Sequence, residues 1–445
     1  MDHERQLGGF TWIYQRACGC IQRSRGHCVV SEPHWPRSRG ADGKTPRNRG
    51  WLIVSVLTVD HVVPGWEPVR DALLEGFHNG EDHGAGVAVY HRGACVVDVM
   101  GGWRDREHTI PYGPDALQTV FSTTKGIMSI AVAMCVQRGL IDYSEKVAKY
   151  WPEFAQAGKQ DVTVAQLLAH RAGLYTLQDQ VSLEDALNWD TMVTRLAATE
   201  PLLPLDSVHA YHAITFGWLA GELVRRVDGR SVSEFVRDEI ARPLGAEFFI
   251  GLPEELETRV ARLMAHPLPS FPLEIAKIML DRGGPGTKGE AALSLNGAFA
   301  PGAFNKPEVH RAQVPGANGI GNARALAKIY AACVGQVDGV QLLTPATVAQ
   351  ATVSMTPVDE VDAVLLSQTD FAMGFMRHNE HYRFTGPEAF GHTGAGGSAS
   401  FADPSRHLGF SYVMNTMMTV YDEDPRRARL IAAAKHCADA ASASA

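Results

Sequence analysis

The stretch Val120-Phe121-Ser122-Thr123-Thr124-Lys125-Gly126-Ile127-Met128 decides how this chain is interpreted. Ser122 and Lys125 lie three residues apart, so on a helix both side chains share one face, about one turn apart. A serine hydroxyl becomes an effective nucleophile when a neighbouring base takes its proton, and a desolvated lysine can be that base. The pair is therefore a candidate reaction centre, although an S-x-x-K spacing alone also arises by chance.

The residues that follow this pair strengthen the prediction. The segment from Gly126 to Gln137 is apolar almost all round, which is typical of a helix buried on every side. Ser122 and Lys125 would then lie at the N-terminal end of a core helix, where unpaired backbone N–H groups favour negative charge. The alternative is an ordinary first turn of a buried helix that carries no chemistry.

Composition and charge exclude several function classes. The chain has 445 residues, of which 45% are hydrophobic and 20% charged, as in a soluble globular protein. Its net charge is −8 and no basic stripe alternates with aromatic residues, so no nucleic-acid partner is predicted. No run of about 18 apolar residues occurs, so no transmembrane segment is predicted.

The N-terminal segment differs from the rest of the chain. Residues 1–50 hold nine Lys and Arg against four Asp and Glu, are rich in Gly, Pro and Ser, and show no hydrophobic periodicity. We expect residues 1–59 to be disordered, or to be a mis-annotated extension from a start codon assigned too early, with the folded chain beginning near Asp60. The apolar run Trp51–Leu57 lies too deep and lacks a cleavage site for a signal peptide. The predicted location is cytoplasmic, and peripheral association with the cell envelope stays open.

The cysteines indicate neither disulfides nor a metal site. Those in the body of the chain are far apart and mostly within apolar runs, as expected for small core residues in a reducing compartment. Near the N-terminus, Cys18-Gly-Cys20 and His27-Cys28 match no zinc-binding spacing. No metal and no cofactor are predicted.

Strand patterns occur at both ends of the chain. Gly86–Tyr90 and Ala94–Met100 predict a hairpin, and Ser398–Ala402 and Phe410–Asn415 predict a second antiparallel pair. Helices are predicted at Pro64–Gly80 before the first pair and at Arg427–Cys437 after the second. Residues 436–445 form a predicted flexible tail.

The middle of the chain predicts helices, including 213–226, 232–240 and 323–334. The fold class is therefore α+β, an antiparallel β-sheet built from N- and C-terminal strands and flanked by helices, with an all-helical domain inserted at about 145–315. Within the irregular stretch 266–316, the apolar cluster Phe271–Leu280 suits a lid or binding loop for a hydrophobic acyl or alcohol group. A disordered connector is the alternative.

Three features in chain order carry a family resemblance. They are Ser122-Thr-Thr-Lys125, then Tyr211 ahead of an apolar helix, then His392-Thr393-Gly394 leading into a strand. Together they resemble the serine β-lactamase and penicillin-binding-protein superfamily, and within it the class C-like esterases, which are family VIII carboxylesterase-like and peptidase S12-like. The resemblance covers about residues 60–435 and implies a β-lactamase/transpeptidase-like fold.

The resemblance implies a role for each motif. Ser122 attacks the carbonyl carbon and carries the acyl group, and Lys125 accepts or relays the serine proton. Tyr211 acts with Lys125 as general base and then as acid to the departing alcohol, its phenolate favoured by the nearby ammonium. His392 stands near Tyr211 and orients the leaving group.

The resemblance also implies how the substrate carbonyl is held. The backbone N–H groups of Ser122 and Ala395 form the oxyanion hole. Thr393, Gly394 and Gly396 line the substrate, because glycines let the strand approach it closely. His170, in a phrase that ends a helix, is expected to be structural.

Two departures from the lactamase pattern narrow the substrate. The pattern has Tyr-x-Asn where this chain has Tyr211-His212-Ala213, and Lys-Thr-Gly where it has His392-Thr393-Gly394. The second change removes the cation that pairs with a β-lactam carboxylate. The resemblance therefore implies a serine hydrolase that cleaves small-molecule carboxylic esters through an acyl-enzyme, as a carboxylesterase or lipase does.

The sequence leaves some other functions open and disfavours others. A β-lactamase, D,D-peptidase or transacylase would use the same fold, and a non-catalytic penicillin-recognition scaffold would lack one of the three motifs. An α/β-hydrolase is disfavoured because no Gly-x-Ser-x-Gly elbow occurs, and a metallohydrolase because no histidine pair has ligand spacing. The sequence carries no signal for acyl chain length or oligomeric state.

Overall fold

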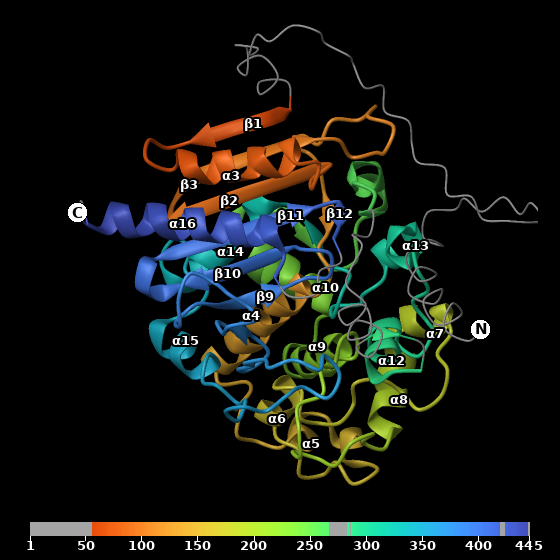
Figure 1. Ribbon diagram of the computed structural model, residues 1–445. Coiled ribbons are helices and arrows are strands. Elements are labelled where there is room, and N and C mark those ends of the chain that lie inside the picture. The colour runs from red at the N-terminus through yellow and green to blue at the C-terminus, as the bar shows by residue number, and fades with distance from the viewer. Residues whose placement is uncertain (1–55, 267–282, 285, 419–422, 444–445) are drawn as a thin grey trace, which may run out of the picture.

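The computed structural model describes residues 56–266, 283–284, 286–418 and 423–443 (Figure 1). The strands are β1 Leu57–Val62, β2 Gly84–His91, β3 Ala94–Gly102, β4 Gln118–Thr119, β5 Phe248–Phe249, β6 Met264–Ala265, β7 Ile320–Gly321, β8 Met376–Arg377, β9 Phe390–Thr393, β10 Ala399–Asp403, β11 Leu408–Met414 and β12 Thr416–Met417. The α-helices are α3 Glu67–His78, α4 Thr123–Gln137, α5 Val147–Tyr150, α6 Val164–Leu168, α7 Leu183–Leu187, α8 Trp189–Ala198, α9 Phe216–Asp228, α10 Val232–Phe235, α12 Lys288–Ser294, α13 Pro307–Arg311, α14 Ala323–Val334, α15 Pro345–Ala351 and α16 Pro425–Ala443. The cysteine cluster at 18–28 and the predicted lid cluster Phe271–Leu280 lie outside the described residues.

The main sheet unites the two ends of the chain. Its seven strands run in the order β1-β3-β2-β11-β10-β9-β8, and every neighbouring pair is antiparallel. The N-terminal strand β2 pairs with the C-terminal strand β11, with Val89 opposite Phe410. This confirms the predicted α+β class and the sheet built from both termini.

The predicted hairpin is present as β2 and β3. Its turn residues Arg92 and Gly93 have φ values of 50° and 81°. Two consecutive left-handed residues match the type I′ turn, whose twist fits that of the flanking strands. Glycine adopts this conformation without the strain that a Cβ atom imposes.

The sheet buries a different core on each face. Alternate residues of β2 point to opposite faces, so Val87 and Val89 join the core under α3 and α16, while Ala88 and Tyr90 join the core under α4 and α14. Figure 1 shows α3 and α16 lying side by side along one face of the sheet. Helix α4, which carries Lys125, lies in the second core, whereas Tyr211 belongs to the first.

Helix α4 is the central element of that second core. Every residue from Thr123 to Cys135 is buried, as its almost continuous apolar sequence predicts. The helix contacts α9, α15 and strands β9 and β10. Its N-terminus therefore lies where the sheet edge meets the helical half of the molecule.

Two predicted boundaries were wrong. Strand β1 begins at Leu57, so folded structure precedes Asp60; its alternating half-exposed pattern is that of an edge strand, which carries a weak hydrophobic signal. Helix α16 continues to Ala443 with Cys437 and Ala438 buried, where a flexible tail was predicted. The helical insertion also contains the two-residue strands β5 and β6, which pair with β7 and β12.

Within the described part of the chain, no helix is both long and apolar enough to cross a membrane.

Candidate active site

Ser122 sits at a strained turn at the start of α4. The preceding residue, Phe121, has a φ of 47°, which places a bulky side chain in the left-handed region. Thr124 stabilises this turn, because its Oγ1 donates to the Phe121 carbonyl at 2.5 Å and accepts from the Gly319 N–H at 2.9 Å. Backbone strain of this kind is typical of residues whose position matters for function.

Lys125 is fully buried and is held by three oxygen atoms. Its Nζ lies 2.9 Å from the Ser122 Oγ, 2.6 Å from the Ala213 carbonyl and 2.7 Å from the Gly316 carbonyl. Burial lowers the pKa of Lys125 well below its usual 10.5. A neutral amine has two N–H donors and one lone pair, so it donates to both carbonyls and accepts the serine proton. Burial thus favours the base form of the lysine.

Tyr211 lies beside Ser122 and Lys125. Its ring centroid lies 4.9 Å from the Lys125 Nζ. Burial raises the pKa of Tyr211 above its usual value, although a hydrogen bond with Ser122 lowers it in part. The expected phenolate is therefore not favoured, because a neutral Lys125 supplies no positive charge to stabilise it. In the resting site Tyr211 is a phenol.

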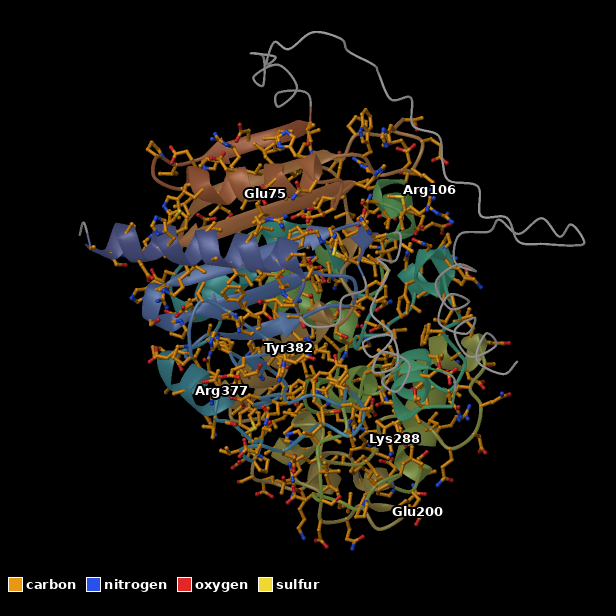
Figure 2. All side chains as sticks on the ribbon, viewed as in Figure 1. Glu75, Arg106, Glu200, Lys288, Arg377 and Tyr382 are labelled. Atoms are coloured by element: carbon orange, nitrogen blue, oxygen red, sulfur yellow. The ribbon has the colours of Figure 1, made fainter. Side chains whose placement is uncertain are left out.

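The Tyr211 ring is held in place by neighbours that the sequence did not single out. Phe371 stacks on it with ring centroids 5.7 Å apart and an interplanar angle of 16°. The Asp362 Oδ1 accepts the Tyr211 backbone N–H at 3.2 Å. The phenol of Tyr382, near the centre of the view in Figure 2, also raises the pKa of Tyr211.

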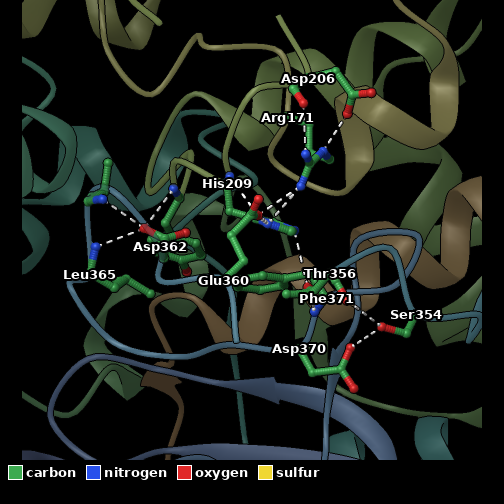
Figure 3. Close-up of polar contacts among 12 residues, drawn as sticks. Arg171, Asp206, His209, Ser354, Thr356, Glu360, Asp362, Leu365, Asp370 and Phe371 are labelled. Carbon is green, nitrogen blue, oxygen red and sulfur yellow. Dashed lines mark hydrogen bonds and ion pairs between the residues drawn. The ribbon is translucent and has the colours of Figure 1, made fainter. Parts of the chain in front are cut away.

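A charged cluster of Arg171, Asp206, His209 and Glu360 holds the segment that leads to Tyr211 (Figure 3). Glu360 accepts from the Arg171 Nη1 at 2.8 Å and pairs with the His209 ring, and Arg171 also pairs with Asp206. Burial lowers the pKa of His209, which keeps the ring neutral despite Glu360. The cluster ties residues 209–211 to the loop that carries Phe371.

His392 lies near Tyr211, with ring centroids 6.1 Å apart. It is buried, and burial lowers its pKa to about 3. The Nδ1 lies 2.7 Å from the Thr393 carbonyl, so it carries the proton and donates to that oxygen. Among the described residues the Nε2 has no hydrogen-bond partner, so it offers an acceptor in the site.

The segment after β9 forms a tight turn against the serine. The Gly397 N–H donates to the Gly394 carbonyl at 3.2 Å, which closes the turn 394–397. A Cβ atom on Gly394 would come within 2.3 Å of the Val120 carbonyl, so only glycine permits this approach. Ala395, at the corner of the turn, is exposed. In the described chain neither its N–H nor that of Ser122 has a protein acceptor.

Ser398 links this turn directly to the serine helix. Its Oγ donates to the Val120 carbonyl at 2.9 Å and lies 3.0 Å from the Thr123 Oγ1. Sequence reasoning missed Ser398, whose signal was its place directly after the glycine-rich box. The carbonyls of Ala213 and Gly316 were also missed, and no residue type marks a backbone acceptor.

The structure brings the predicted residues together around Ser122. Lys125 and Tyr211 contact Ser122, and His392 lies beside Tyr211. Gly394 lies against the Val120 carbonyl and the Thr123 side chain, next to Ser122, and Ala395 and Gly396 follow it in the same turn. The Thr393 side chain contacts the neighbouring strand β8, its Oγ1 lying 3.5 Å from the Met376 sulfur.

His170 packs beneath the site, with its ring 4.9 Å from that of Tyr211. Its Nδ1 accepts the His212 backbone N–H at 3.1 Å. Among the described residues, no group of three or more His, Cys, Asp or Glu side chains is placed to hold a metal ion.

Comparison with known proteins gives consistent results. The family model described as "Beta-lactamase" matches residues 71–434. "Esterase/beta-lactamase LipL" of Mycobacterium tuberculosis is 35% identical over 360 residues, which are 80% of this chain and 82% of that protein.

The similar solved structures agree with these sequence matches. A penicillin-binding protein homologue from Caulobacter crescentus has a TM-score of 0.77 and 39% identity, covering 86% of this chain and 99% of that one. A family VIII carboxylesterase has a TM-score of 0.76 and 35% identity with the same coverage.

Proposed function

The chain belongs to the beta-lactamase family, and from this premise we propose that it is a serine carboxylesterase acting through an acyl-enzyme on Ser122. The observation that carries the proposal is the placement of Lys125. Its Nζ is 2.9 Å from the Ser122 Oγ, and two backbone carbonyls occupy its N–H groups. The remaining lone pair of the neutral amine is therefore left to accept the serine proton.

Acylation begins with attack of the Ser122 Oγ on the ester carbonyl carbon. As the Oγ–C bond forms, the serine proton passes to the Lys125 Nζ and the carbonyl electron pair moves to its oxygen. The resulting oxyanion accepts hydrogen bonds from the N–H groups of Ser122 and Ala395, which have no other acceptor in the described chain.

Collapse of the intermediate releases the alcohol. The bond between the acyl carbon and the alkoxy oxygen breaks, and Tyr211 gives its phenolic proton to the leaving oxygen while Lys125 returns a proton to the phenol. Tyr211 suits this role because its raised pKa keeps it protonated in the resting site. Water then cleaves the acyl-enzyme by the same steps in reverse, which restores Ser122.

The site favours a neutral substrate. His392 stands where the lactamase pattern has a lysine, and burial lowers its pKa to about 3, so it carries no charge at neutral pH. Its Nε2 accepts rather than donates and suits the hydroxyl of a departing alcohol or of an attacking water. Ala213 supplies only its backbone carbonyl, to Lys125, where the pattern has an asparagine side chain.

A substrate panel tests this proposal. Purified protein is assayed with p-nitrophenyl esters from acetate to laurate, with nitrocefin and with a D-alanyl-D-alanine peptide. We expect ester turnover that disappears in Ser122→Ala and persists in Ser144→Ala, a matched substitution at an exposed serine. Faster turnover of nitrocefin or of the peptide than of every ester would contradict the ester assignment. Full ester activity in Ser122→Ala would contradict the mechanism.

A further inference from the structure

A buried arginine, Arg426, contacts the turn that follows the His392-Thr393-Gly394 box. It lies in the first turn of α16, and its side chain is 1% exposed. Its Nη2 donates to the Gly396 carbonyl at 2.6 Å, and the Met418 N–H donates to the same oxygen at 3.1 Å. The turn 394–397 is thus fastened on the side away from Ser122.

The guanidinium is fixed by partners on three other segments. Asp424 accepts from its Nε at 3.1 Å and from its Nη2 at 2.7 Å, a two-point grip that sets the plane of the group. Its Nη1 donates to Asp82 at 3.2 Å and to the Thr416 carbonyl at 2.9 Å. Tyr412 donates to the same Asp82 oxygen at 2.6 Å. A donor held by this many partners has little freedom to follow a moving loop.

The turn and the cluster are in direct contact. A Cβ atom on Gly397 would lie 2.4 Å from the Asp424 Oδ2 and 2.5 Å from the Arg426 Nη2. Gly397 has a φ of 130°, which few other residues adopt. Between its two anchors, Ser398 on the serine side and Arg426 on the other, the turn has room for one conformation, and that conformation presents the Ala395 N–H.

We propose that Arg426 is a positioning residue for the oxyanion hole, which holds the Ala395 N–H in the direction of the substrate oxygen through the Gly396 carbonyl. The proposal rests on the proposed function, since it assigns the Ala395 N–H to the tetrahedral intermediate. A hydrogen bond to an oxyanion depends steeply on direction, and loss of one such donor costs an enzyme about 10²–10³ in kcat. A partly misplaced donor gives part of that loss.

The test compares Arg426→Lys with Arg429→Lys. Lysine keeps the positive charge but has one nitrogen, which cannot reach both Asp424 and the Gly396 carbonyl as the arginine fork does. Arg429 is on the same helix and pairs with Glu75 and Glu81, and none of its described contacts is with the turn 394–397. It therefore controls for the loss of an arginine from α16.

Two readouts separate positioning from general stability. With a p-nitrophenyl ester, we expect Arg426→Lys to lower kcat about 10- to 100-fold, with KM changed less than about threefold. Phenylboronic acid forms a tetrahedral adduct on a serine and samples the same hole, so its affinity should fall in parallel with kcat/KM. Arg429→Lys should leave both values within about twofold of the wild type.

Several results would overturn the proposal. A folded Arg426→Lys protein with wild-type kcat and wild-type boronate affinity would show that the arginine is only structural. If Arg426→Lys does not fold, Asp424→Asn is used instead, because asparagine keeps the shape of the aspartate but holds the guanidinium less strongly. The proposal then requires that kcat and boronate affinity fall together, by about three- to tenfold. Ester turnover that is independent of Ser122 would instead refute the proposed function.

Discussion

Replacing Lys125 with methionine should change how the stability of the protein depends on pH. In the folded protein burial lowers the pKa of Lys125 well below 10.5, whereas in the unfolded chain the lysine returns to that value. Between the two pKa values the folded state holds a neutral amine and the unfolded state an ammonium, so unfolding takes up one proton. The free energy of unfolding of the wild type must then rise with pH in this window.

The magnitude follows from proton linkage. One proton taken up on unfolding corresponds to about 1.4 kcal/mol per pH unit. Between pH 8.0 and pH 9.5 the wild type should gain about 2 kcal/mol over Lys125→Met. The variant also leaves the carbonyls of Ala213 and Gly316 without a donor, at about 1–3 kcal/mol each, but this cost does not vary with pH. Only the slope therefore reports the protonation state.

Urea unfolding followed by circular dichroism measures the slope. Both proteins are unfolded at several pH values from 8.0 to 9.5, and the difference between their free energies of unfolding is plotted against pH. Lys288→Met, at an exposed position labelled in Figure 2, shows what the loss of a surface lysine does by itself. A difference between wild type and Lys125→Met that stays constant over this range would refute the neutral amine, and with it the role of Lys125 as base.

Three further outcomes are expected. Tyr211→Phe should lower kcat about 10²–10⁴-fold, as loss of a general acid does, while esters with better leaving groups lose less; equal losses for all esters would refute the acid role. Ser398→Ala should reduce stability by about 1–2 kcal/mol, because the Val120 carbonyl loses one of its two donors and keeps only the Thr123 N–H, and unchanged urea midpoints would contradict this link. The kcat/KM of the wild type should fall as the pH is lowered, because Lys125 gains a proton. His392 should cause no further decrease in kcat/KM above pH 5, since its pKa is lowered to about 3. The pH profile of His392→Gln should therefore show the same decrease as that of the wild type.

Much of the fold could be predicted because its signals are local. The apolar runs of β2 and β3, the turn at Arg92-Gly93 and the apolar run of α4 each lie within a short stretch of sequence. The start of the folded chain was predicted too late because half of the residues of the edge strand β1 face solvent and resemble a loop. The end of α16 was missed because its last turns are rich in Ala and Ser, and only packing against the sheet buries Cys437.

The side chains of the site could be predicted, but their protonation states could not. The S-x-x-K spacing on a helix brings Ser122 and Lys125 together whatever the rest of the fold does. The charge on Lys125 depends on its burial, to which distant segments such as those of Ala213 and Gly316 contribute, and the motif itself does not reveal that burial. The phenol of Tyr211 depends on burial under Phe371, which lies 160 positions further along the chain. Burial therefore disfavours the expected phenolate.

The most direct test of the central claim is the location of the acyl group during turnover. The protein is mixed with a p-nitrophenyl ester, quenched with acid within the first turnovers, digested and analysed by mass spectrometry. The acyl mass should appear on the peptide that contains Ser122, and it should be absent from Ser122→Ala. An acyl group on another residue, or turnover of the ester with no acylated peptide at any quench time, would contradict the acyl-enzyme on Ser122.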